Sequence, residues 1–243
     1  MDQLKNLADS RLLGGCTYCG GSEETRDHVP SRVFLDPPFP ENLPVVPACF
    51  PCNNGFSRDE EYLACLIECV IAGSTDPGMI QRPRVSAILE RSSSLRSRIE
   101  SAKIMVDERP AFIPEADRVQ NVLRKLALGH AAFELSSAGR EPTSLHWWPL
   151  SSMTHEQREN FDAPHVAHML AEIGSRAVQR MLVTQITLAS PNGERSEMQL
   201  IINDWIEVQE GRYRYLGIDD IGGIRVRIVL SEYLACEAFW SDQ

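Results

Sequence analysis

Four cysteines near the N-terminus stand in two Cys-x-x-Cys pairs. The stretch CTYCG holds Cys16 and Cys19, and the stretch CFPCN holds Cys49 and Cys52. Two such pairs supply four sulfur ligands from two tight turns, which is the donor set and spacing of a tetrahedral zinc site. Four thiolates leave no open position for a substrate, so the predicted Zn²⁺ is structural. A redox dithiol is the alternative for either pair alone, but no thioredoxin-like strand and helix surround the pairs.

Polar residues between and beside these pairs have the chemistry needed for hydrolysis. The stretch RDHVP contains Asp27 followed by His28, and Asn53 and Asn54 follow the last cysteine. A histidine titrates near neutral pH and is suited to activate water as a general base. A carboxylate and an amide oxygen are suited to hold a divalent cation on a phosphate group. Asp27 and His28 point to opposite faces of a strand, so they share a site only where the strand ends or bends, as Pro30 favours.

The order of these motifs resembles that of the HNH endonucleases, most closely a branch with the elements DHVP, NLPVVPAC and CN. The resemblance covers residues 14–62. It implies a ββα-metal fold in which His28 is the general base, and Asp27 and Asn53 are ligands of one catalytic Mg²⁺ or Mn²⁺. It also implies that Asn42 braces the loop and orients the base. Asn53 departs from the histidine often found at its position, and an amide oxygen favours Mg²⁺ or Mn²⁺ over Zn²⁺.

The activity that this resemblance implies is metal-dependent hydrolysis of phosphodiester bonds in nucleic acid. DNA is the expected substrate, and 5′-phosphate and 3′-hydroxyl ends are the expected products. A different class of function uses the same residues, namely a zinc-stapled module that binds nucleic acid or protein without catalysis. The formal net charge of −10 disfavours tight non-specific binding of nucleic acid, which requires a basic surface. Residues 81–135, with ten Lys or Arg against seven Asp or Glu, are the place where a local basic strip is expected.

The elements that must position these residues are expected to make an α+β fold in two parts. Residues 1–75 form the zinc-stapled nuclease module, and residues 76–243 form helices followed by an antiparallel sheet. The spacing of apolar residues and the turn signals predict helices over 1–13, 57–74, 82–101 and 115–136. The second of these helices is expected to begin with a capping box of Ser57 and Glu60 and to end at Gly73. About four strands are expected over 180–190, 197–209, 213–218 and 223–232, with the sheet ending near 233–240.

The remaining notable residues are expected to be structural. Cys65, Cys69 and Cys236 lie in apolar stretches typical of buried thiols. The two tryptophans of SLHWWP are assigned to the core rather than to base stacking. Arg26 and Arg32 flank the Asp-His pair. We interpret them as solvated surface charges rather than as contacts to phosphate. The N-terminus has no signal-peptide pattern and the chain has no long apolar run, which predicts a cytoplasmic protein with no membrane partner and leaves its oligomeric state open.

Overall fold

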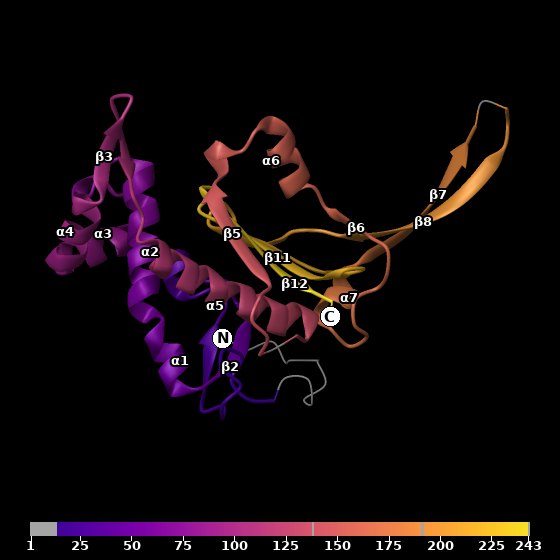
Figure 1. Ribbon diagram of the computed structural model, residues 1–243, viewed down its shortest axis with the longest axis horizontal. Coiled ribbons are helices and arrows are strands. Elements are labelled where there is room, and N and C mark those ends of the chain that lie inside the picture. The colour runs from indigo at the N-terminus through magenta and orange to yellow at the C-terminus, as the bar shows by residue number, and fades with distance from the viewer. Residues whose placement is uncertain (1–13, 138, 191, 243) are drawn as a thin grey trace.

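The structure is a computed structural model that describes residues 14–137, 139–190 and 192–242 (Figure 1). The helix expected over residues 1–13 lies outside the described residues. The helices are α1 (Phe50–Gly55), α2 (Ser57–Ala72), α3 (Pro83–Arg91), α4 (Ser93–Ser101), α5 (Ala116–Leu135), α6 (His155–Asp162) and α7 (Arg176–Arg180), with short 3-10 helices η1 (Arg32–Phe34), η2 (Pro77–Met79) and η3 (Leu150–Ser152). The strands are β1 (Thr25–His28), β2 (Val45–Ala48), β3 (Lys103–Val106), β4 (Arg109–Phe112), β5 (Ser144–Pro149), β6 (His165–Ala167), β7 (Leu182–Ala189), β8 (Arg195–Asn203), β9 (Ile206–Gln209), β10 (Tyr213–Asp220), β11 (Gly223–Leu230) and β12 (Leu234–Ser241).

The predicted α+β class is confirmed, since helices occupy the middle of the chain and antiparallel strands its C-terminal part. The N-terminal part begins with an antiparallel hairpin of β1 and β2, and α1 starts directly after β2. A loop with the short helix η1 joins the two strands of this hairpin. Two strands followed by a helix is therefore the order of elements around the cysteine pairs.

The C-terminal strands form two sheets where one sheet of about four strands was predicted. The larger sheet has the order β5-β12-β11-β10-β9, and a smaller one has the order β6-β8-β7. The segment predicted as one strand over 197–209 is interrupted at Asp204, whose carboxylate accepts the backbone N–H of Trp205 at 2.7 Å. The strand is broken there, and β8 and β9 belong to different sheets. The β7–β8 hairpin extends away from the body of the molecule (Figure 1).

Helix α5 runs between the N-terminal hairpin and the larger sheet (Figure 1). Its predicted apolar stripe is confirmed, because the following side chains are at most 1% exposed: Val119, Val122, Leu123, Leu126 and Ala127. The same buried cluster continues from Val29 and Val46 of the N-terminal part to Tyr215 and Val226 of the larger sheet. The predicted boundary at residue 75 remains a prediction, and the core of the described residues extends across it.

The predicted end of helix α2 is confirmed, whereas the predicted capping box at its start is wrong. Gly73 ends the helix in the left-handed conformation, with φ 64°, as predicted. The predicted capping box is wrong because Ser57 is already inside the helix and its hydroxyl donates to the carbonyl oxygen of Asn54 at 2.9 Å. The Glu60 carboxylate does not turn back to the helix start. It is buried and accepts a hydrogen bond from Lys125 of α5.

The helix predicted over 82–101 is two helices, α3 and α4, because Ser92 leaves helical geometry with φ −109° and ψ 81°. Ser92 begins a run of three serines, whose side chains favour turns and helix ends over helix interiors. The hairpin of β3 and β4 that follows α4 was not predicted.

The three cysteines and two tryptophans that were predicted to be structural are buried or half-buried. Cys65, Cys69 and Cys236 are buried, and burial raises the pKa of each thiol, that of Cys69 to about 12. Trp147 and Trp148 are half-buried in β5 and pack against the hydrophobic core. Among the described helices, none combines the length and the apolar character that a bilayer crossing requires.

Candidate metal and catalytic site

Strand pairing brings the two cysteine pairs together. The turn that holds Cys16 and Cys19 precedes β1, and Cys49 directly follows β2. Because β1 and β2 are antiparallel, the start of one lies beside the end of the other, with Thr25 opposite Ala48. A further backbone bond from Thr17 to the carbonyl of Pro47, at 3.0 Å, fixes the first turn against β2.

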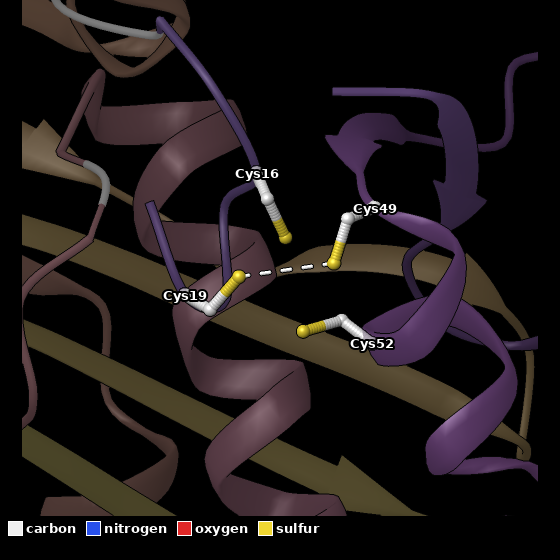
Figure 2. A group of neighbouring side chains, drawn as sticks. All are labelled: Cys16, Cys19, Cys49 and Cys52. Atoms are coloured by element: carbon white, nitrogen blue, oxygen red, sulfur yellow. Dashed lines mark hydrogen bonds between the residues drawn. The ribbon is translucent and has the colours of Figure 1, made fainter. Parts of the chain in front are cut away.

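The four cysteine sulfurs form a compact cluster (Figure 2). All four Sγ atoms lie within 4.8 Å of one another, and those of Cys19 and Cys49 are 3.7 Å apart. Four sulfurs bound to one zinc ion at about 2.3 Å have tetrahedral edges of about 3.8 Å. The arrangement of Cys16, Cys19, Cys49 and Cys52 therefore has the dimensions of a site that could hold a metal ion such as zinc.

The protein environment prepares at least one of these thiols for ligation, which requires the thiolate form. Burial opposes the ionisation of Cys16, but the backbone N–H groups of Cys49, Tyr18 and Cys19 outweigh burial and lower the pKa of Cys16 to about 7. Burial raises the pKa of Cys52. Cys16 is therefore the first of the two to become a thiolate.

Asn53 lies in α1 and reaches back to β1. Its backbone N–H donates to the carbonyl of Cys49 at 3.0 Å, which makes the first helical turn. Its side-chain Nδ2 donates to Thr25 Oγ1 at 3.1 Å and to the carbonyl oxygen of Arg26 at 3.2 Å. Because a carbonyl can only accept, the amide nitrogen must face the strand, and the Asn53 amide oxygen is turned away from these two partners. Asn54, the alternative donor, is exposed.

Asp27 points to the inner face of β1 and is only 7% exposed. Its Oδ2 accepts a hydrogen bond from Tyr18 Oη at 2.8 Å and forms an ion pair with Lys125 Nζ, also at 2.8 Å. Lys125 is 1% exposed and binds the carboxylate of Glu60 as well. Its Nζ also donates to Ser31 Oγ at 2.9 Å. Asp27, the candidate metal ligand, therefore shares one buried lysine with Glu60.

His28 points to the opposite face of β1, as strand alternation requires, and is half-buried. Strand β1 ends at His28, two residues before Pro30, which agrees with the predicted strand end. Arg32 Nη2 lies 3.2 Å from His28 Nε2. Because a guanidinium can only donate, Nε2 is the accepting nitrogen and Nδ1 carries the proton. Burial lowers the pKa of His28 and the Arg32 cation lowers it further, against the opposing charge of Asp27, so the imidazole is neutral at pH 7.

Asn42 lies apart from this group. It is exposed in a turn between η1 and β2. Within the part of the chain that the structure describes, no residue hydrogen-bonds to the Asn42 side chain. Its predicted role in orienting His28 remains a prediction, whereas the structure shows that Arg32 contacts the imidazole. Sequence reasoning did not identify Lys125 or Tyr18 as partners of Asp27, since no local motif marks either residue.

Comparison of the chain with protein-family models, with curated proteins and with solved structures gave no match. The likeness to HNH endonucleases therefore rests on the motifs in residues 14–62.

Proposed function

We propose that this chain is a metal-dependent endonuclease of the HNH type that hydrolyses phosphodiester bonds of nucleic acid, with DNA as its expected substrate. The observation that carries the proposal is the position of His28, a neutral imidazole, at the end of β1, a strand whose first two residues hydrogen-bond to Asn53 of α1. The four cysteines hold a structural Zn²⁺ that clamps this hairpin to α1.

In this proposal, His28 Nε2 takes a proton from the water that attacks phosphorus. A general base must be unprotonated at the working pH, and the lowered pKa of His28 meets this requirement. Arg32 contacts Nε2 in the structure at 3.2 Å. A phosphate group attracts a guanidinium strongly, so an incoming substrate draws Arg32 away from the imidazole and frees Nε2.

Asp27 and Asn53 would hold a catalytic Mg²⁺ or Mn²⁺ through a carboxylate and an amide oxygen. Two protein oxygens fit such an ion, which usually retains several waters and binds substrate phosphate in addition. Because Asp27 Oδ2 is committed to Tyr18 and Lys125, Oδ1 is the oxygen left for this role. A divalent ion held there supplies neutralisation of the charge that develops on the phosphate and the leaving oxygen.

The test is cleavage of supercoiled plasmid DNA, and of labelled DNA and RNA oligonucleotides, with Mg²⁺ or Mn²⁺. We expect the wild type to cleave DNA, and His28→Ala to lose cleavage while it retains its zinc content and its circular dichroism spectrum. The matched control is His155→Ala, at a histidine whose side chain is 87% exposed on α6. Equal cleavage by wild type and His28→Ala, or no cleavage by wild type under any of these conditions, would refute the proposal.

A second candidate function is a zinc-stapled module that binds nucleic acid or protein without catalysis. The observation that favours it is the ion pair between Asp27 and Lys125, because a cation already occupies part of the carboxylate that the catalytic metal needs. Binding of DNA by a wild type that does not cleave it with either metal would favour this candidate.

A further inference from the structure

Two neighbouring hollows lie on the surface formed by α2, α3 and α4. The first has a volume of about 390 Å³ and is lined by Arg32 of η1, by Glu61 of α2, and by Arg84 and Arg91 of α3. The second has a volume of about 320 Å³ and is lined by Arg58 and Glu61 of α2, by residues of α4 and by Arg118 of α5, which is paired with Asp59. Glu61 lines both hollows, so they are neighbours, and we call the two together the arginine groove after Arg32, Arg84, Arg91 and Arg58.

The arginine groove is positive within a chain whose net charge is −10. Of the two glutamates in its first hollow, Glu60 shares the cation of Lys125 with Asp27, and Glu61 lies 3.9 Å from the largely exposed Arg91. Among the described residues, neither Arg84 nor Arg58 has a carboxylate within ion-pair distance. Guanidinium groups without a paired carboxylate, here those of Arg84 and Arg58, attract a polyanion even when the rest of the surface repels it.

A continuous set of contacts connects the arginine groove to His28. Arg32 Nη2 lies 3.2 Å from His28 Nε2, and the backbone carbonyl of Arg32 accepts a hydrogen bond from Arg84 Nη1 at 3.1 Å. The guanidinium groups of Arg32 and Arg84 both lie over the ring of Phe39, at 5.5 and 5.7 Å from its centroid. Phe39 therefore holds both arginines at the end of the groove nearest the imidazole.

The spacing of the arginines suits a repeating anion. Arg84 and Arg91 are seven residues apart on α3, so they lie on one face of the helix and about 10 Å apart along its axis. Arg32 lines the same hollow as Arg84 and Arg91 and also contacts His28. Two guanidinium groups this far apart can each contact a different phosphate of one strand, whereas a single small anion cannot contact both.

We propose that the arginine groove binds the sugar-phosphate backbone of nucleic acid and leads one phosphodiester to His28. This inference rests on the function proposed above for His28. Arg84 and Arg91 contact phosphates, and Arg32 transfers from the imidazole to the phosphate that reaches it. Because these contacts are to the backbone, binding through the groove is independent of base sequence and strongly dependent on salt.

The test is a binding measurement in the His28→Ala background, so that the substrate stays intact. Fluorescence anisotropy measures Kd for a labelled DNA duplex and for an RNA of the same sequence, without added divalent ions, between about 50 and 200 mM salt. The test variant carries Arg84→Gln and Arg91→Gln in addition. The matched control carries Arg140→Gln and Arg195→Gln, at two exposed arginines outside the groove, so that the change in net charge is the same.

We expect the groove variant to bind about ten- to a hundredfold more weakly than its parent, with the slope of log K against log salt reduced by about 2. The control is expected to bind like the parent. Equal weakening in the control and the groove variant would overturn the inference, because net charge and not the groove would then set affinity. Unchanged affinity of the groove variant would also overturn it, as would failure of the parent to bind either nucleic acid.

Cleavage assays separate this inference from the proposed function. If the wild type cleaves DNA and the two groove substitutions leave Kd unchanged, the groove inference fails and the nuclease proposal stands. If the groove substitutions weaken binding but the wild type never cleaves, the nuclease proposal fails and the groove remains a nucleic-acid site.

Discussion

The contact between His28 and Arg32 adds to the effect of burial on the pKa of the imidazole. Burial and the Arg32 cation both lower the pKa of His28. A positive charge disfavours the protonated imidazole, so its removal must raise the pKa toward the usual value of about 6.5. We predict that the pKa of His28 rises in Arg32→Gln, as measured by NMR titration of the imidazole. Arg140→Gln is the control, and an unchanged midpoint in Arg32→Gln would show that Arg32 does not set the protonation of His28.

The buried imidazole of His130 leads to a second prediction, which concerns how stability depends on pH. It is fully buried in α5, stacked on Tyr215 at 3.7 Å between ring centroids, with Nε2 at 2.8 Å from Tyr213 Oη. Its Nδ1 has no hydrogen-bond partner among the described residues. Burial lowers the pKa of His130 to about 3, so the folded protein keeps the imidazole neutral, whereas the unfolded chain protonates it near pH 6.5.

This difference makes the folded protein less stable as the pH falls below about 6.5. The contribution of His130 is complete above the unfolded pKa and decreases by about 1.4 kcal/mol per pH unit until the folded pKa is reached. Urea unfolding at pH 7 and pH 5 is expected to show that the wild type loses about 2 kcal/mol more stability than His130→Gln over this interval. The same loss in both proteins would contradict the assignment of His130 as the titrating group.

At the scale of elements, one glycine sets the distance between α5 and the end of β1. A Cβ at Gly129 would lie 2.6 and 2.9 Å from the two methyl groups of Val29, which is fully buried and stiff because it is β-branched. We predict that Gly129→Ala lowers stability, although alanine is favoured over glycine by about 1 kcal/mol in a helix interior. It should also move the imidazole signals of the adjacent His28.

Two variants control this prediction. Gly55→Ala introduces a Cβ with no heavy atom within 4 Å and should leave the His28 signals unchanged. Combining Gly129→Ala with Val29→Ala removes the clashing methyl groups and should restore the His28 signals of the wild type. Thermal unfolding and two-dimensional NMR measure both effects. A Gly129→Ala protein as stable as the wild type, with unshifted His28 signals, would refute the prediction.

The features that the sequence predicts are those set by residues close together in the chain. Helices α2 and α5 could be predicted from their apolar spacing because the buried face of each helix is formed by residues three or four positions apart. The cysteine cluster could be predicted because the ligands of each pair come from a single turn. The partition of the C-terminal strands into two sheets could not, since it depends on a break at Asp204 inside a run of strand-forming residues. The ion pair of Asp27 and Lys125 joins segments far apart in the chain, and no local pattern indicates it.

Helix α5 supplies contacts that the N-terminal part needs in order to fold. Lys125 of α5 supplies the only cation paired with Asp27 among the described residues, and it also pairs with Glu60. A fragment of residues 1–75 lacks this lysine and exposes the apolar face of α2 that packs against α5. A buried carboxylate without its partner costs several kcal/mol, and so short a chain has little stability to spare.

We therefore predict that the fragment of residues 1–75 does not fold even with zinc. Circular dichroism and a two-dimensional NMR spectrum of the zinc-loaded fragment are expected to show little helix and poorly dispersed signals. The full chain under the same conditions is the control. A well-dispersed spectrum from the fragment would instead support a separate domain that ends near residue 75.

The buried lysine also constrains how this chain can vary over evolution. Replacement of Lys125 by an apolar residue would leave Asp27 and Glu60 as two unpaired charges in the interior, which natural selection removes. Viable substitutions at these three positions must therefore arise together or in an order that keeps the charges matched. In sequences that share this fold, we expect the three positions to covary, so that a lineage without the lysine has also neutralised at least one of the carboxylates.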